Sequence, residues 1–127
     1  MSSRSEKVMR FRELHRNGCF IIPNPWDIGG ARMMTKLGFK ALATTSSGYA
    51  FSKGKVDMTR DVDRDETLQY AAAIAASTHL PVSADTEDCY ATTTEGVAET
   101  VRLAASNSDA NANESSPASA ATLRFGK

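Results

Sequence analysis

The chain has 127 residues, of which 41% are hydrophobic, and this is enough for one modest globular domain. Fifteen basic and fifteen acidic side chains cancel, so charge gives no argument for nucleic acid, an anionic membrane or a strongly charged protein partner. The two cysteines form neither a disulfide framework nor a zinc-binding pattern. With no apolar stretch of signal-peptide or membrane-span length, the sequence predicts a cytoplasmic protein.

The first part of the chain predicts a helix, a strand and a second helix. Apolar side chains recur at every third position within residues 4–17, which is typical of a short amphipathic helix. The continuously apolar run 19–22 is followed by a proline and predicts a strand buried on both faces. A helix is then expected to begin at Pro25, with Asn24 as its cap, and to end at a left-handed cap at Gly38.

Two further pairs of strand and helix follow. Residues 41–44 predict a second buried strand and residues 65–78 a helix. The loop 45–64 between them is long, and loops above about 12–15 residues are usually functional or disordered. Residues 81–84 predict a third strand, and residues 92–105 a helix that opens with a Thr-x-x-Glu capping box.

Three successive units of strand and helix indicate an α/β fold with a parallel sheet and outer helices. The pattern leaves a barrel and a doubly wound sheet both open, although no glycine-rich nucleotide-binding motif follows any strand. Residues 106–127 are rich in Ser, Ala and Asn and predict a disordered or aberrant tail, because such a segment buries too little apolar surface to fold. The sequence therefore predicts a domain over residues 1–105.

Polar side chains gather just after the C-terminal ends of the three predicted strands. Asn24 and Asp27 follow the first strand, residues 44–48 the second and residues 85–88 the third. Parallel α/β folds place their binding and catalytic sites at this end of the sheet. These three clusters are therefore the candidates for the functional site.

Each cluster also has a purely structural interpretation. Asn24 and Asp27 can simply cap a helix. The polar segment 46–48 can be an ordinary turn, or its hydroxyl and N–H groups can hold a carboxylate or a developing oxyanion. The three carboxylates within residues 85–88 suit a hard cation such as Mg²⁺, or form a solvated acidic turn.

The long loop and the cysteines add further candidates. Most charges near a helix start only favour the helix dipole, but an acid, a base or a metal ligand is available among Asp57, Asp61, Asp63 and Asp65. Cys19 is expected to be buried and inert, whereas Cys89 lies in the acidic loop and is the more reactive candidate.

The same residues carry a resemblance to a known family. Five segments in order are similar to the opening half of the isocitrate lyase and phosphoenolpyruvate phosphomutase superfamily: PNPWDIGGAR, ALATTSSGYAFSKGKVD, RDETL, LPVSADTEDCYA and EGVAETVRLA. The resemblance runs from residue 11 to residue 105 and is greatest to the small branch of 2-methylisocitrate lyase-like and oxaloacetate decarboxylase-like enzymes.

The resemblance implies the first three units of strand and helix of an incomplete (β/α)₈ TIM barrel, preceded by an N-terminal helix. It implies a Mg²⁺-dependent carbon–carbon lyase, or a phosphonopyruvate-type mutase, that acts on a small 2-oxo or 2-hydroxy carboxylic acid through an enolpyruvate-like intermediate. Family members are expected to be homo-oligomers. The alternative is that the chain is a truncated, non-catalytic remnant of such an enzyme.

The resemblance also assigns roles to particular residues. It implies a catalytic role for Asp57, a metal site at Asp85 and more weakly Glu87, and a substrate-carboxylate turn formed by Ser47, Gly48 and Tyr49. Ser83 stands where many members have another metal-site aspartate. Cys89 and Ala91 stand where glycines are common, so strain is expected if this turn needs a positive φ.

Overall fold

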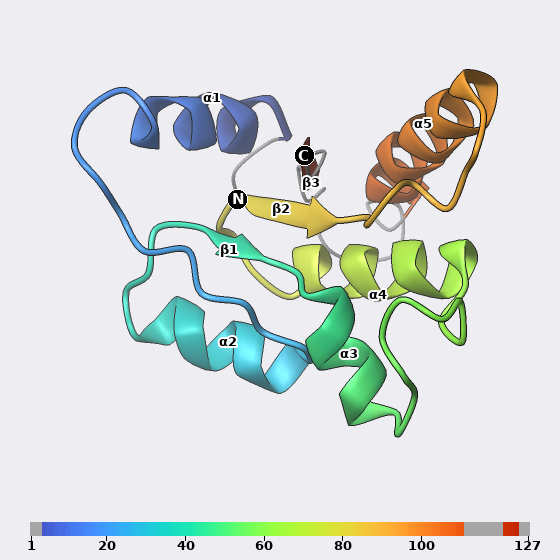
Figure 1. Cartoon of the computed structure of the whole chain (residues 1–127). Coiled ribbons are helices and arrows are strands. Elements are labelled where there is room, and N and C mark those ends of the chain that lie inside the picture. The colour runs from blue at the N-terminus through green and yellow to red at the C-terminus, as the bar shows by residue number, and fades with distance from the viewer. Residues whose placement is uncertain (1–3, 111–120, 125–127) are drawn as a thin grey trace.

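The computed structural model describes residues 4–110 and 121–124. Within these residues the three strands form one parallel sheet in the order β1-β2-β3 (Figure 1). The elements in chain order are α1 (Arg4–Leu14), α2 (Ile28–Lys36), β1 (Leu42–Ala43), α3 (Ser46–Ser52), α4 (Arg64–Ala76), β2 (Val82–Asp85), α5 (Thr94–Ala110) and β3 (Ala121–Arg124). The predicted α/β class is confirmed, while closure into a barrel stays a prediction.

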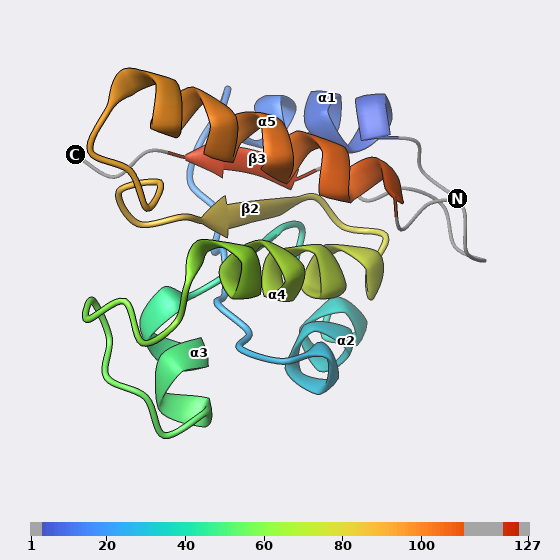
Figure 2. The same ribbon diagram turned by 90° about the vertical axis from the view of Figure 1, so that its right-hand side faces the viewer.

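The helices that flank β2 cover the sheet side by side. Figure 2 shows α4 and α5 lying along the strands, each running opposite to them, as expected for units of strand and helix. The arrowheads of β2 and β3 point to the same end of the molecule, and the loops that follow α3 and β2 lie at that end (Figure 2). The sheet therefore brings the polar segments of two loops together.

The core lies between the strands β1 and β2 and the helices α2 and α4. Tyr70, Ile74 and Ala75 of α4 pack against Leu42 and Val82 of the sheet. Because α4 is rich in alanine, it can approach the strands closely, and the larger side chains of Tyr70 and Ile74 fill the space between helix and sheet. Burying a side chain such as Ile74 stabilises the fold by about 1.5–3 kcal/mol.

The predicted first strand is wrong, because residues 19–22 form no strand. Ile21 is 73% exposed and Cys19 is also exposed, so the run is not buried on both faces. The backbone hydrogen bond described between this part of the chain and β1 runs from the Ala43 N–H to the Pro23 carbonyl at 3.1 Å. Pro23 and Pro25 have no N–H to donate, which limits pairing along this segment.

The start of α2 differs from the predicted one. Asp27 is the N-terminal cap, and its Oδ1 accepts a hydrogen bond from the Gly30 N–H at 2.6 Å. Asn24, the predicted cap, instead reaches β1, where its side-chain amide lies 3.4 Å from the Ala43 carbonyl. The predicted left-handed residue after the helix is confirmed, since Gly38 has φ of +88°.

The long loop contains a helix that the sequence pattern missed. Thr45 caps α3, and its Oγ1 accepts a hydrogen bond from the Gly48 N–H at 3.1 Å. The segment 46–48, expected to be a turn, is therefore the first turn of a helix. The predicted helix after the loop is confirmed, with Asp63 as its cap through a 2.8 Å hydrogen bond from the Glu66 N–H.

The last part of the chain also departs from expectation. α5 begins at Thr94, and the hydroxyl that accepts from the Gly96 N–H, at 3.1 Å, belongs to Thr93 rather than Thr92. The helix continues to Ala110, and β3 pairs with β2 inside the segment expected to lack structure. Strand pairing uses backbone groups, so the composition of that segment does not prevent it. Residues 111–120 and 125–127 lie outside the described residues.

None of the helices among the described residues is long and apolar enough to cross a membrane.

Candidate functional site

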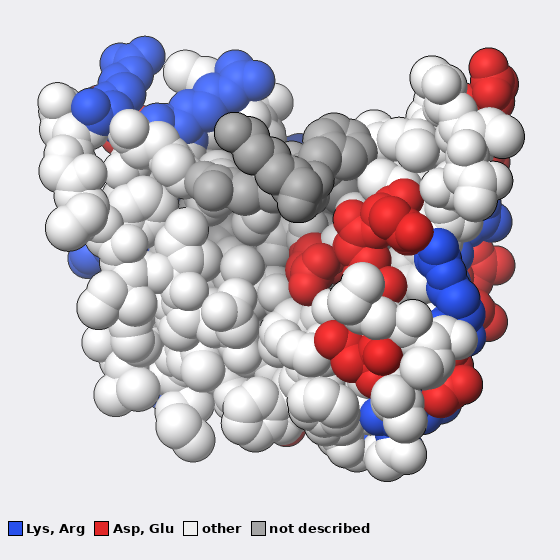
Figure 3. All heavy atoms as spheres, in the orientation of Figure 1, with Lys and Arg blue, Asp and Glu red and all other residues white. Residues whose placement is uncertain are grey.

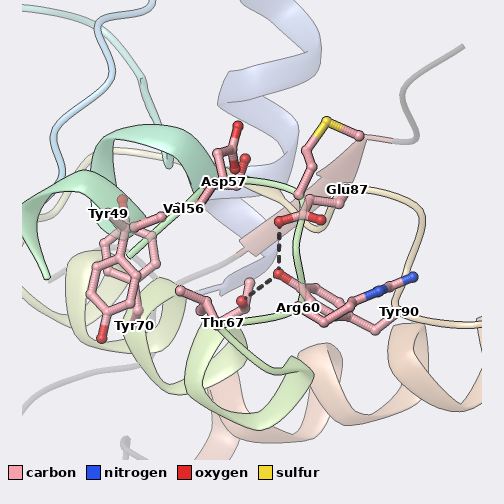
Figure 4. A pocket seen from close by; sticks show the side chains of 12 residues that line it. Tyr49, Val56, Asp57, Arg60, Thr67, Tyr70, Glu87 and Tyr90 are labelled. Atoms are coloured by element: carbon pink, nitrogen blue, oxygen red, sulfur yellow. Dashed lines mark hydrogen bonds between the residues drawn. The ribbon is translucent and has the colours of Figure 1, made fainter. Parts of the chain in front are cut away.

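A small pocket lies where the loop after α3 and the loop after β2 meet. Figure 4 shows Asp57 and Glu87, from these two loops, on the same side of the pocket. Tyr49 and Tyr70 lie together at one end, and Arg60 and Tyr90 at the other (Figure 4). The lining residues are Ser46, Tyr49, Ala50, Val56, Asp57, Met58, Arg60, Val62, Thr67, Tyr70, Glu87 and Tyr90.

Asp57 contributes a buried oxygen atom that lacks a partner. Among the described residues, its Oδ1 is the buried side-chain polar atom with no hydrogen bond. Leaving such an atom unsatisfied costs about 1–3 kcal/mol, and groups of this kind call for an explanation such as a bound ligand, ion or water. The sequence-predicted catalytic residue is thus available to accept a hydrogen bond from a bound molecule.

Glu87 is held by a hydroxyl chain that starts on α4. The Tyr90 hydroxyl donates to Oε1 of Glu87 at 3.0 Å, and lies 2.7 Å from Oγ1 of Thr67 (Figure 4). Burial raises the pKa of Tyr90 to about 12, and the hydrogen bond to Glu87 acts in the same direction. Tyr90 therefore stays protonated near neutral pH and keeps the Glu87 carboxylate in place.

Two stacked tyrosines form the other end of the pocket. The rings of Tyr49 and Tyr70 lie 4.1 Å apart between centroids, and the Tyr49 hydroxyl donates to Oε1 of Glu66 at 3.2 Å. Burial raises the pKa of Tyr70 to about 12. The Tyr70 hydroxyl donates to the Pro25 carbonyl at 2.9 Å and accepts from the Thr45 N–H at 3.2 Å, so it ties the start of α3 to α4.

Asp85 lies at the end of β2 and joins the two loops through backbone hydrogen bonds. Its Oδ2 accepts from the Ser46 N–H and its Oδ1 from the Glu87 N–H, both at 3.1 Å. The Thr44 hydroxyl accepts from the Asp85 N–H at 2.8 Å and fixes the backbone there. The predicted substrate turn and the predicted metal-site aspartate are therefore neighbours.

The loop after β2 contains three residues with unusual backbone geometry within a stretch of four. Glu87, Cys89 and Tyr90 have φ of +50°, +61° and +54°, in the left-handed region that favours glycine. The condition for strain is met at Cys89, which has a positive φ, whereas Ala91 is not among the residues with positive φ. Strained backbone of this kind clusters at functional sites and persists where neighbouring contacts enforce it.

The two cysteines are reversed relative to expectation. Cys89 is 2% exposed, whereas Cys19, expected in a buried strand, is exposed. Cys89 has a positive φ, and its buried thiol lies 3.7 Å from Oγ1 of Thr86. Cys89 is therefore shielded in spite of its place among acidic residues.

The surface around the pocket is acidic. Figure 3 shows Asp and Glu side chains gathered on the half of the face that carries α3 and the loops after α3 and β2, with a smaller number of basic side chains along the edge of this group. The remaining half of that face carries almost no acidic side chains, and its charged side chains are basic ones near α1 at the top and at the edge (Figure 3). An acidic surface favours the approach of cations to this end of the sheet.

The structure brings some of the predicted site residues together and leaves others apart. Tyr49, Asp57 and Glu87 line one pocket, while Ser47, Gly48 and Asp85 do not line it. Asp85 reaches the pocket indirectly, through Ser46 and Glu87. The assigned roles of these six residues stay predictions.

Four pocket residues with polar side chains are not indicated by the sequence, namely Arg60, Thr67, Tyr70 and Tyr90. A signal existed for Tyr70, because it is the large hydroxyl-bearing side chain in the otherwise alanine-rich run YAAAIAA. Tyr90 directly follows the acidic segment, and a buried tyrosine usually needs a polar partner. Arg60 and Thr67 gave no local signal, since their contacts lie far along the chain.

Comparisons with known proteins agree on one family. A sequence model of the phosphoenolpyruvate phosphomutase family matches residues 11–113 of the chain. A protein of Mycobacterium tuberculosis, described only as uncharacterized, is 37% identical over 94 residues, which cover 73% of this chain and 36% of that protein.

Solved structures give the same result. A candidate lyase/mutase from Burkholderia cenocepacia is 50% identical with a TM-score of 0.78, over 82% of this chain and 37% of that one. A candidate phosphonomutase from the same organism is 37% identical with a TM-score of 0.75, over 80% and 42% of the two chains. Oxaloacetate acetylhydrolase bound to its product oxalate is 27% identical with a TM-score of 0.68, over 76% and 35%. The chain thus spans well under half the length of these relatives.

Proposed function

The chain belongs to the phosphoenolpyruvate phosphomutase family. We propose that it is part of an enzyme that makes or breaks a C–C or P–C bond in a small 2-oxo or 2-hydroxy carboxylic acid. The proposed reaction is that of a Mg²⁺-dependent carbon–carbon lyase or a phosphonopyruvate-type mutase, with an enolpyruvate-like intermediate. Similar proteins include a candidate lyase/mutase and a candidate phosphonomutase, which supports both reaction types.

One observation carries the proposal. Asp57 and Glu87 come from different loops and line one pocket at the C-terminal end of a parallel sheet, and the buried Oδ1 of Asp57 has no partner among the described residues. Sites of α/β proteins lie at this end of the sheet. A carboxylate kept free at such a place is suited to accept a hydrogen bond or a proton from a bound acid.

The donor set fits Mg²⁺ in a limited way. Within the described residues no three potential ligands from His, Cys, Asp and Glu come together. Mg²⁺, however, often binds through one or two carboxylates and several waters. Asp85 and Glu87 are joined by a 3.1 Å hydrogen bond and would hold the ion in that manner. When bound, Mg²⁺ would supply positive charge beside the enolate oxygen.

The chain's own groups then have distinct tasks. We assign binding of the substrate carboxylate to the start of α3, where hydrogen bonds described for the resolved part of the chain occupy the N–H groups of Ser46 and Gly48 but not that of Ser47. An N–H at a helix start favours an anion. Asp57 would accept a hydrogen bond or a proton from the substrate, and Tyr49 would contribute its ring to the pocket wall.

A second candidate is a chain that is non-catalytic by itself. It is favoured by the short span of the match, between 35% and 42% of the solved relatives. A barrel of this kind has about 250 residues, so other strands would contribute further site residues in a whole enzyme. The two candidates differ in whether these 127 residues bind substrate at all.

Calorimetric titration decides between them. The chain is titrated first with MgCl₂ and then with oxalate, the stable product bound to a similar enzyme. Saturable oxalate binding that requires Mg²⁺, lost in Asp57→Asn and kept in Asp65→Asn, is expected. Asp65 is the matched control, because it is an exposed aspartate paired with Arg64 at 3.1 Å. A cooperative melt without any Mg²⁺-dependent binding would establish the second candidate for this chain.

The proposed function also implies an oligomeric state and a cellular compartment for the protein. We expect a homo-oligomer in the cytoplasm with a small carboxylic acid as its ligand and neither nucleic acid nor membrane as partner. Sedimentation at several concentrations tests the oligomer, and a mass independent of concentration that equals one chain would contradict it.

A further inference from the structure

Arg60 connects the two loops that form the pocket. It belongs to the loop between α3 and α4, which also carries Asp57, but both of its described contacts lie in the loop after β2. Its guanidinium donates to Oδ2 of Asp88 at 2.7 Å and lies over the Tyr90 ring, 4.8 Å from the centroid. Figure 4 shows Arg60 stacked on Tyr90 at the edge of the pocket.

The surface that Arg60 meets is fixed by the rest of the fold. The Tyr90 hydroxyl is held between Thr67 of α4 and the Glu87 carboxylate. Oδ1 of Asp88 accepts from the Tyr90 N–H at 3.0 Å, which leaves Oδ2 for Arg60. The contacts of Arg60 therefore join its own loop to residues that hydrogen bonds hold in place.

The loop with Asp57 needs such an anchor. Met58 and Arg60 have φ of +60° and +66°, so two residues on either side of Thr59 are in a costly conformation. The Asp57 side chain lies just before them with one buried oxygen unpaired. Both features oppose closure of the loop, and the contacts of Arg60 act against them.

We propose that Arg60 is a positioning residue, which latches the Asp57 loop to the loop after β2 and so holds Asp57 beside Glu87. The latch itself depends only on the contacts described, whereas its effect on ligand binding rests on the proposed function. The competing view is an ordinary surface ion pair, since the side chains are 45% and 62% exposed. Such a pair changes an equilibrium constant by less than about fivefold.

Limited proteolysis measures the latch directly. Endoproteinase Asp-N cuts before aspartate, and its cuts before Asp57 report the open loop when opening is fast relative to cleavage. The cut before Asp61 is not used, because it breaks the bond that residue 60 itself forms. Because Arg60→Gln removes both the ion pair and the ring contact, these cuts are expected to become about five- to tenfold faster. The control Arg102→Gln removes an ion pair of 2.6 Å on α5 and should leave them unchanged. Equal rates in Arg60→Gln and wild type would overturn the latch.

Two further variants separate the contacts. Asp88→Asn keeps an oxygen for the Tyr90 N–H but removes the charge, so it should accelerate the cuts less than Arg60→Gln. The double variant should match Arg60→Gln alone, because both changes break the same contact. Fully additive effects would show that Arg60 and Asp88 act separately and would contradict the latch.

Oxalate titration in the presence of Mg²⁺ then tests the positioning role. Arg60→Gln should weaken oxalate binding by at most the factor that the proteolysis gives, because the affinity falls with the fraction of chains whose loop is closed, and Arg60→Lys should restore part of it. Faster cleavage with unchanged oxalate affinity would overturn the positioning role. Absence of oxalate binding in wild type would refute the proposed function and this role with it, while the proteolysis would still decide whether the latch exists.

Discussion

The Ser46 N–H donates a hydrogen bond to Oδ2 of Asp85 at 3.1 Å, across 39 positions of the sequence. This bond joins the start of α3 to the end of β2. The Glu87 N–H occupies the other oxygen of the same carboxylate. One aspartate thus organises both segments that the sequence marked as substrate and metal sites.

Removing this carboxylate should loosen both segments. Asp85→Ala leaves two N–H groups in a half-buried place without an acceptor, so we expect the free energy of unfolding to fall by about 1–2 kcal/mol. Asp85→Asn keeps one acceptor oxygen and should lose about half as much. Urea unfolding measures both, and identical midpoints for wild type and Asp85→Ala would show that the two bonds contribute nothing.

Gly48 is required because Thr45, the residue that caps α3, lies close to its Cα. A Cβ at this position would lie 2.7 Å from Cγ2 of Thr45. Gly48→Ala should therefore lower the free energy of unfolding by about 1–3 kcal/mol, less the gain of about 1 kcal/mol for alanine in a helix. In Thr45→Ser, which keeps the capping hydroxyl and loses Cγ2, the same change should become neutral or stabilising. If Gly48→Ala costs as much in both backgrounds, the clash is not the cause.

Lys7 should make stability depend on pH. It is 3% exposed, its Nζ donates to the Thr78 carbonyl at 2.9 Å, and burial lowers its pKa from 10.5 to about 8. Above pH 8 the folded chain releases a proton that the unfolded chain keeps, so the free energy of unfolding should rise with pH up to 10.5.

The buried tyrosines act in the opposite direction above about pH 10, because their pKa values are raised to about 12 and the unfolded chain then ionises first. The measurement is therefore made by urea unfolding from pH 8 to about 9.5. Lys7→Met should flatten the rise, whereas Lys40→Met, at an exposed position, should keep it. A rise that persists in Lys7→Met would assign it to another group.

Burial predicts the order of thiol labelling. Cys19 is exposed and Cys89 is 2% exposed, so iodoacetamide should modify Cys19 at least about tenfold faster in the folded chain. Mass spectrometry of the labelled peptides gives both rates, and urea should make them similar. Faster labelling of Cys89 in the folded chain would contradict the described loop.

Local chemistry in the sequence predicted the helix over α4, the left-handed residue at Gly38 and the parallel arrangement of β1 and β2. It failed where a choice depended on distant groups. Asn24 and Asp27 are both suitable helix caps. Asp27 caps α2, whereas the side-chain amide of Asn24 contacts the Ala43 carbonyl of β1. The apolar run at residues 19–22 resembled a strand, but the described backbone bond to β1 comes from Pro23, which follows the run.

The sequence by itself determined the family, the class of fold and the polar segments after the strands, because each of these is written in residues close together along the chain. Only the tertiary structure decided which side chains share the pocket. Arg60 meets Asp88 and Tyr90 meets Thr67 over separations of 28 and 23 positions, after the sheet has brought their loops together. The burial of Cys89 was decided in the same way, since it depends on how the loop after β2 folds, and no pattern of neighbouring residues records the positive φ found there.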